Sequence, residues 1–118
     1  MLHRMQCDIV QACIQVIRAL LAEMQDEDEL FASANTLQHV EIHLLVIAQT
    51  LAHLSPALYQ RLTRIDWHGW QHLRQLLEQD IHPRREEVWY SIRALAPATL
   101  ELIAQLRRQE PVWFEIGY

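Results

Sequence analysis

Hydrophobic residues recur along most of this chain at spacings of three and four residues, the period of an α-helix that buries one side. Over residues 2–24 they form two adjacent rows, which predicts a helix packed against several neighbours. The rows are Ile9, Cys13, Val16, Leu20 and Met24, and Val10, Ile14, Ile17 and Leu21. Over 37–54 a single row predicts a second helix that opens near Ser33 or Asn35, both good capping residues. That row is Val40, Leu44, Ile47, Leu51 and Leu54.

Capping residues and prolines divide the second half of the chain. The pair Ser55–Pro56 predicts a short helix that ends near Leu62. Asp66 is expected to cap the next helix, which must end before His82 because Pro83 disfavours helical geometry in the residue ahead of it. The inner face of that helix would carry Trp67, Trp70, Leu73, Leu76 and Leu77.

A last helix is predicted to run from Pro83 and to stop at Pro111. Pro97 lies inside it and lacks a backbone donor, which predicts a kink or a break near residues 93–96. The chain then ends in the apolar tail PVWFEIGY. Apolar surface of that kind is costly to leave in water, so we expect the tail to fold back on its own domain or to cover a partner chain.

Composition agrees with a helical domain. The 118 residues include only two glycines and four prolines, which leaves few places for strand turns. We therefore predict an all-α protein, an antiparallel four-helix-type bundle with a short extra helix and an aromatic C-terminal tail. Its domain organisation is a helical domain over residues 1–110 followed by the tail over 111–118.

The charge balance limits the classes of partner. The net charge is −5, and all ten basic side chains are arginines. Broad capture of nucleic acid needs a basic surface that displaces counterions, so we expect no DNA binding, while a local arginine patch for RNA stays open.

The cysteines and the apolar run near the N-terminus indicate in which cellular compartment the protein is expected. Cys7 and Cys13 are six residues apart, roughly 9 Å along a helix, which is too far for an easy disulfide. We expect both thiols to be reduced and buried in a cytoplasmic protein. Polar residues interrupt the run from Ile9 to Leu21, so neither a signal peptide nor a membrane-spanning helix is expected.

Two groups of polar residues could be taken for metal sites. Asp26–Glu29 are four consecutive acids that point in different directions, which is typical of a solvated connection. His39 and His43 share one side of a helix, but no third ligand stands at a suitable offset. We expect no metal site and no cofactor.

Candidate catalytic and phosphate-binding residues are concentrated at the corner between the last two long helices. Arg74 precedes it, His82 lies in it beside Asp80, and Arg84 and Arg85 follow. A histidine that exchanges a proton near neutral pH, next to arginines that neutralise a phosphate, is the minimum equipment of a metal-independent ribonuclease. The same residues are equally compatible with a hydrogen-bond network that holds the corner.

Several segments, in this order, resemble the HEPN superfamily, and within it the HepT-like proteins grouped as domain of unknown function 86. They are DIVQACIQVI, Phe31, LLVIAQTLAHLS, IDWHGWQHLR and EEVWYSIRALAPATLELI. The resemblance covers the chain from about Met5 to Leu106. It implies a helical homodimer, encoded beside a minimal nucleotidyltransferase that acts as antitoxin. It also implies a cleft across the dimer in which an arginine binds RNA phosphate and a histidine acts as acid or base, with four to six residues between the two in the sequence.

On this resemblance Arg74 matches the family's arginine, and His82 is the nearest downstream histidine. Seven residues separate the two, and Gln79 and Ile81 occupy the positions of the usual histidine and of the tyrosine that the partner modifies. Three hypotheses follow: a HepT-like binding subunit with a degenerate ribonuclease motif, an active ribonuclease toxin that uses Arg74 and His82, or an unrelated helical interaction protein. Arg84 and Arg85 are the predicted RNA- or phosphate-binding residues.

Overall fold

The computed structural model describes residues 2–114, which contain helices and no strand. The helices are α1 (Leu2–Leu21), α2 (Glu27–Ala32), α3 (Ala34–Ala52), α4 (Pro56–Arg61), α5 (Trp67–Glu78), α6 (Arg85–Tyr90), the π-helical η1 (Ser91–Leu95), α7 (Ala96–Gln109) and the 3₁₀ helix η2 (Pro111–Phe114). The predicted all-α class is confirmed.

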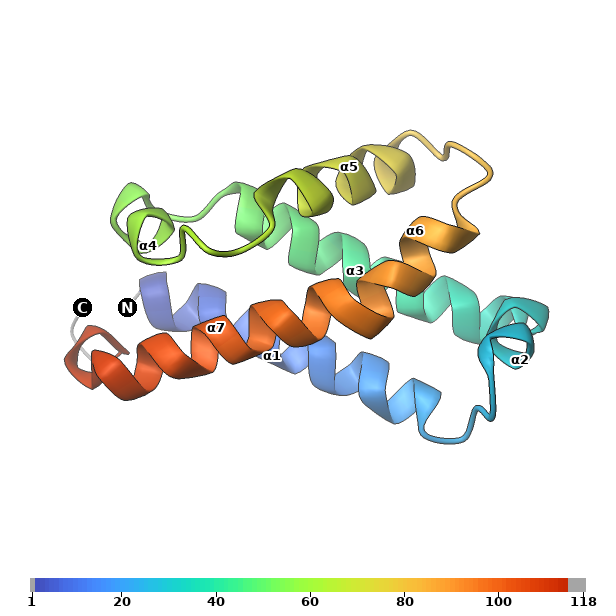
Figure 1. Cartoon of the computed structure of the whole chain (residues 1–118), viewed down its shortest axis with the longest axis horizontal. Helices are drawn as coiled ribbons and strands as arrows, with labels where there is room; N and C mark the ends of the chain where they lie inside the picture. The colour runs from blue at the N-terminus through green and yellow to red at the C-terminus, as the bar shows by residue number, and fades with distance from the viewer. Residues whose placement is uncertain (1, 115–118) are drawn as a thin grey trace.

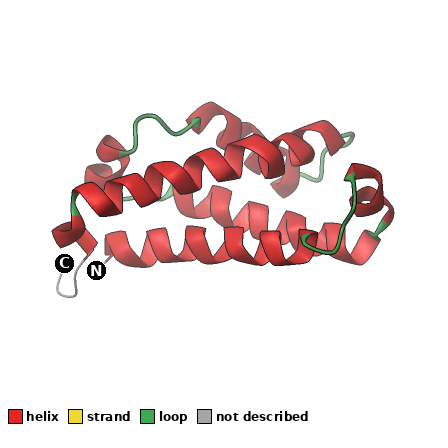
Figure 2. Ribbon diagram, turned by 60° about the horizontal axis from the view of Figure 1, so that its bottom comes forward, coloured by secondary structure: helices red, strands yellow, loops and turns green. Residues whose placement is uncertain are grey.

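Four long rods make up the body of the molecule. Helices α1, α3 and α5 and the continuous α6–η1–α7 rod alternate in direction, so that both ends of the chain lie at the same end of the bundle (Figure 1). α1 packs along α3 and α7, and α3 packs along α5. The short helices α2 and α4 close the two ends (Figure 2). The predicted antiparallel four-helix-type bundle with a short extra helix is confirmed, and α2 is a second short helix.

The core fills the space between the four rods with aliphatic side chains and one tryptophan. Trp70 is almost fully buried, and its indole N–H donates a hydrogen bond to the Thr99 hydroxyl at 2.9 Å. Thr99 in turn donates to the Leu95 carbonyl at 2.8 Å. Since a buried indole N–H needs an acceptor, this pair fixes the register of α5 against α7.

The two hydrophobic rows of α1 differ in how far they are buried. Val10, Ile14 and Ile17 are buried, as the pattern predicts. Ile9 and Val16 belong to the other row and are exposed, so the expectation that both rows are covered is wrong. Periodicity alone does not tell how many neighbours a helix has, and among the described residues α1 packs mainly against α3 and α7.

The acidic run lies at the start of α2, and its side chains are exposed or half-exposed, as predicted for a solvated connection. Asp26 accepts a hydrogen bond from the Glu29 amide at 2.9 Å and so caps α2. Acids in the first turn complement the exposed amide groups there. Ser55 and Asp66 cap α4 and α5 in the same way, as predicted, with hydrogen bonds from Leu58 N and Gly69 N.

The last rod begins at Arg85, two residues after the predicted start at Pro83. The break predicted near residues 93–96 takes the form of the π-helical turn Ser91–Leu95. A π-turn widens the helix by one residue, which accommodates a proline whose ring would otherwise meet the preceding turn. Pro97 then stands in the first turn of α7, directly after this π-turn.

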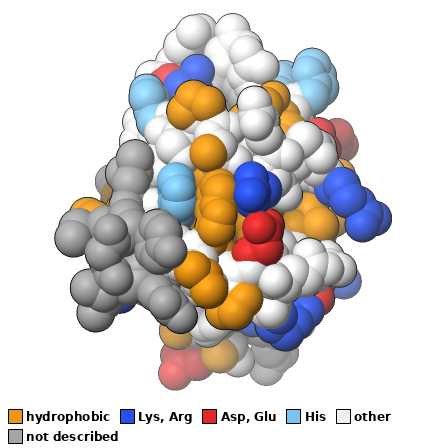
Figure 3. Space-filling view, turned by 90° about the vertical axis from the view of Figure 1, so that its left-hand side faces the viewer, with side chains coloured by type: hydrophobic (Ala, Val, Ile, Leu, Met, Phe, Trp, Pro, Cys, Tyr) orange, Lys and Arg blue, Asp and Glu red, His pale blue; other side chains and the backbone are white. Residues whose placement is uncertain are grey.

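The described part of the tail folds back on its own domain. Phe114 is buried, and the Trp113 ring lies between the His3 ring, 4.4 Å away, and the Arg61 guanidinium, 3.9 Å from its centre. Arg61 also pairs with Glu110 at 2.8 Å. Basic, acidic and hydrophobic side chains accordingly meet at this end of the bundle (Figure 3). Residues 115–118 of the predicted tail lie outside the described residues.

Both cysteines are buried and free, as predicted. Burial raises the pKa of the Cys7 thiol to about 11, so the unreactive thiol form prevails. Among the described residues no helix is long and apolar enough to span a membrane.

Candidate functional site

The corner between α5 and α6 is a helix end of defined geometry. Asp80 adopts the left-handed conformation at φ 51°, and the amide of Ile81 donates to the Leu76 carbonyl at 2.9 Å. This six-to-one bond is the signature of a Schellman helix end, where glycine or asparagine is usual. The peptide bond between His82 and Pro83 is cis. Helix α5 thus ends before His82, as predicted.

Arg84 links this corner to α3. Its guanidinium donates two parallel hydrogen bonds to the Glu41 carboxylate, at 2.9 and 3.0 Å, and a third to Asp80 Oδ1 at 2.7 Å. The Arg84 and Glu41 side chains are only 13% and 18% exposed. The pKa of Arg84 is raised, chiefly by the hydrogen bonds to Glu41. This ion pair is bidentate and is the least exposed ion pair in the described part of the chain, and both features strengthen such contacts.

Arg85 makes a second link, to α2. It donates to Glu27 at 3.2 Å and to Asp28 at 2.6 Å, and its guanidinium carbon lies 4.5 Å from the centre of the Phe31 ring. The two predicted phosphate-binding arginines, Arg84 and Arg85, are therefore both engaged by carboxylates. In this arrangement they hold α6 against α3 and α2.

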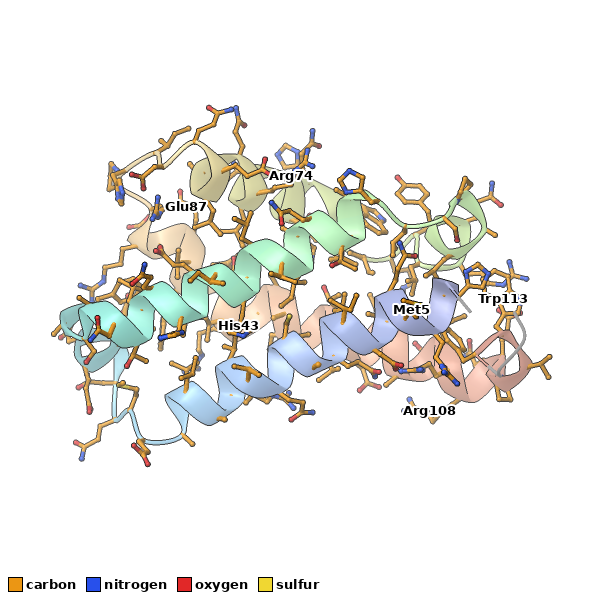
Figure 4. All side chains as sticks on the ribbon, turned by 180° about the vertical axis from the view of Figure 1, so that it is seen from behind. Met5, His43, Arg74, Glu87, Arg108 and Trp113 are labelled. Carbon is orange, nitrogen blue, oxygen red and sulfur yellow. The ribbon has the colours of Figure 1, made fainter. Side chains whose placement is uncertain are left out.

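Arg74 has a different environment. It projects from α5 beside the C-terminal half of α3 (Figure 4) and lines a pocket of about 270 Å³ between these helices. Its closest carboxylate is that of Glu78, at a loose 3.9 Å. Within residues 2–114 the Arg74 guanidinium donates no hydrogen bond. Of the four candidate residues, Arg74 is the one whose charge stays available to a ligand.

His82 lies elsewhere. It lines a shallow depression near Phe31 and Leu37, and its Nε2 is 2.9 Å from Asp80 Oδ1, the same oxygen that accepts from Arg84. Arg74 and His82 line different pockets of the protomer. The Schellman turn ends α5 and the chain then reverses direction. His82 therefore lies beyond the helix and not on an extension of it, which separates it from Arg74.

Sequence reasoning missed two parts of the site. Glu41 stands 43 residues before Arg84, and no local signal connects them. The second part is an apolar surface patch beside the ion pair, formed by Ile42 and Leu45 on α3 and Leu77 on α5. Ile42 is 49% exposed, and Leu45 and Leu77 are half-buried.

Comparison of the chain with known protein families, with curated proteins and with solved structures found no match.

The hydrogen bonds at Asp80 predict a pH dependence of stability. Arg84 and then His82 hold the pKa of the Asp80 carboxyl below its ordinary value of 3.8. A carboxyl whose folded pKa is lowered stabilises the fold above its unfolded pKa, and that contribution disappears as the pH falls through the folded pKa. We expect Asp80→Asn, which keeps the left-handed turn, to melt below the unaltered protein at pH 7.

Circular dichroism melts between pH 2 and 7 check this expectation. The difference in melting temperature between Asp80→Asn and the unaltered protein should close as the pH falls through the lowered pKa of the Asp80 carboxyl, because the aspartate then loses its charge. Asp26→Asn is the control for acid effects elsewhere. A difference that stays constant over this range contradicts a role of the Asp80 charge.

Proposed function

We propose that this protein is a HepT-like HEPN subunit that binds a nucleotidyltransferase-like partner and carries a degenerate ribonuclease motif. The main support is that Arg74 lines a pocket to which no histidine of residues 2–114 contributes. A general acid or base must come within hydrogen-bond reach of the reacting group, and the position where the resemblance places it holds Gln79. A binding role needs only the arginine and the surface around it.

The apolar patch supports a homodimer as the assembled form. Ile42, Leu45 and Leu77 adjoin the Glu41–Arg84 ion pair, and exposed apolar patches rimmed by polar groups are typical contact surfaces. Two-fold symmetric pairing would place the same patch on both chains. The patch lies on the side of the molecule that bears the corner, which is the side the HEPN resemblance favours.

One observation favours the second candidate, an active metal-independent endoribonuclease. His82 and Asp80 are exposed and 2.9 Å apart, and a carboxylate hydrogen-bonded to one nitrogen of an imidazole is a common way to orient a catalytic histidine. In that case His82 of one chain would have to meet Arg74 of the other across the dimer.

Co-expression with the product of the neighbouring gene tests the binding role. We expect a nucleotidyltransferase-like protein to copurify with this chain in a fixed ratio through two chromatography steps, and the two to associate at micromolar concentration when mixed. The isolated chain should leave RNA intact in EDTA. Absence of a complex at that concentration contradicts the binding role.

The same preparations distinguish the ribonuclease. An active ribonuclease should cleave RNA without metal, and the cleavage rate should fall at least a hundredfold in both Arg74→Ala and His82→Ala but not in the control Arg18→Ala. This result would establish ribonuclease activity and contradict the hypothesis of a degenerate motif. Arg18 is an exposed arginine on α1 without a carboxylate partner among the described residues. A chain that neither cleaves RNA nor binds the neighbouring product is the unrelated interaction protein.

A further inference from the structure

The pocket that Arg74 lines has a shape and a chemistry of its own. Its floor consists of buried Ala48, Leu51 and Trp70, and its mouth is bordered by Tyr59, Trp67 and Arg74. These residues come from α3, α4 and α5, so the fold and not one local motif creates it. The volume of about 270 Å³ lies just below the roughly 300–1,000 Å³ typical of drug-sized ligands. The pocket therefore fits a small molecule.

The aromatic walls present apolar ring surface and few donors. The Trp67 N–H donates to the Leu62 carbonyl at 3.1 Å, and the Trp70 N–H is used by Thr99. The Tyr59 and Trp67 rings lie 4.7 Å apart at 36°, which holds the exposed Tyr59 ring beside the half-buried indole. Because both indole donors are spent, these walls favour a flat ring that stacks or packs edge-on.

The charge of the pocket comes from a single group. Among the described residues Arg74 is the one charged side chain that lines the pocket. Its guanidinium has only the loose contact with Glu78 at 3.9 Å, so it can make a bidentate contact with a phosphate or a carboxylate. Within residues 2–114 no second cation lines the pocket to bind further phosphates. Other arginines, such as Arg61 and Arg84, are engaged by carboxylates. The electrostatics thus select one anionic group and disfavour a polyanion.

We propose that this pocket binds a small aromatic anion, a planar ring system with one phosphate or carboxylate group, with the ring against Trp67 and Tyr59 and the anion on Arg74. A nucleoside monophosphate and an aromatic carboxylate share this chemistry. The site is complete within one chain and requires neither the nucleotidyltransferase-like partner nor the dimer.

Isothermal titration of the full chain with defined probes tests the site. We expect adenosine monophosphate or indole-3-acetate to bind with a dissociation constant below 1 mM. The neutral ring alone, as adenosine or indole, and inorganic phosphate alone should each bind at least tenfold more weakly. Tighter binding of adenosine monophosphate indicates a phosphate ligand, and tighter binding of indole-3-acetate indicates a carboxylate ligand. Binding of either compound supports the proposed pocket.

Two pairs of variants locate the binding. Arg74→Ala should weaken the anion at least tenfold and leave the affinity for the neutral ring unchanged, while Arg18→Ala changes neither. Ala52→Trp adds an indole at the exposed rim of the pocket and should abolish binding of both anion and ring, whereas Ala57→Trp, on α4 outside the pocket, should not. Circular dichroism melts of the four variants confirm that each is folded.

Three results overturn the proposal. The first is that no aromatic anion binds at millimolar concentration. The second is that Arg74→Ala and Arg18→Ala bind the anion equally well. The third is that a single-stranded RNA decamer binds more tightly than the mononucleotide and loses its affinity in Ala52→Trp, which would make the pocket part of a polymer track. None of these results bears on copurification of a protein partner, so the two proposals fail independently.

Discussion

Arg84→Ala is expected to lower the free energy of unfolding by about 2–3 kcal/mol. The substitution removes three hydrogen bonds at 2.7–3.0 Å and leaves the Glu41 carboxylate, 18% exposed, without its bidentate partner. Removal of one member of a buried pair costs more than the pair contributes, because the other charge stays poorly solvated. The remaining exposure of Glu41 places the effect slightly below the roughly 3–5 kcal/mol typical of fully buried pairs.

Arg85→Ala is the matched control, since it removes the same charge from the neighbouring residue. Arg85 is 46% exposed and pairs with solvent-accessible acids, so its loss should cost much less stability than the loss of Arg84. Arg84→Lys keeps the charge but not the bidentate geometry and should fall between the two alanine variants. Urea unfolding followed by circular dichroism measures all three.

A second variant separates the charge of Glu41 from its packing. Glu41→Gln combined with Arg84→Ala removes the orphaned carboxylate, so the double variant should be more stable than Arg84→Ala alone. If Arg84→Ala and Arg85→Ala lose the same stability, or if the double variant is the least stable, the ion pair does not hold the corner in the way the distances indicate.

Ile42→Asp is expected to convert a dimer into a monomer. The unaltered chain should elute in light scattering at twice its mass of 14.0 kDa. In a symmetric dimer each copy of the substitution would put an unpaired carboxylate into the centre of the apolar patch, at a cost of several kcal/mol. Loss of about 2.7 kcal/mol weakens the dissociation constant a hundredfold, which analytical ultracentrifugation resolves at micromolar concentration.

Ile9→Asp is the control, because the chain has a rival apolar surface on α1. Ile9 is 41% exposed, close to the 49% of Ile42, and belongs to a stripe with exposed Met5 and Val16. Met5 marks its N-terminal end in Figure 4. The Ile9→Asp protein should remain dimeric. If Ile9→Asp dissociates the dimer and Ile42→Asp does not, the interface lies on α1. If the unaltered chain is a monomer, the proposed homodimer is contradicted.

The fold could be predicted because its signals are local. Hydrophobic periodicity marks α1, α3 and α5, and helix ends follow from single residues such as Ser55, Asp66 and Pro83 that change the backbone geometry or its hydrogen bonds. The break before Pro97 was predictable for the same reason. Its form as a π-turn was not, since that depends on how η1 packs against α5.

By itself the sequence determined the all-α class, the order and most ends of the helices, the buried cysteines and the arginine-rich corner. Only the tertiary structure decided which corner residues act together. Asp80 turns left-handed after α5, so His82 and Arg84 leave the direction of the helix, and Arg84 meets Glu41 from a distant segment. Arg74 remains on the helix and lines a pocket whose other walls come from α3 and α4. Contacts between distant segments depend on how whole helices pack, which local spacing does not encode.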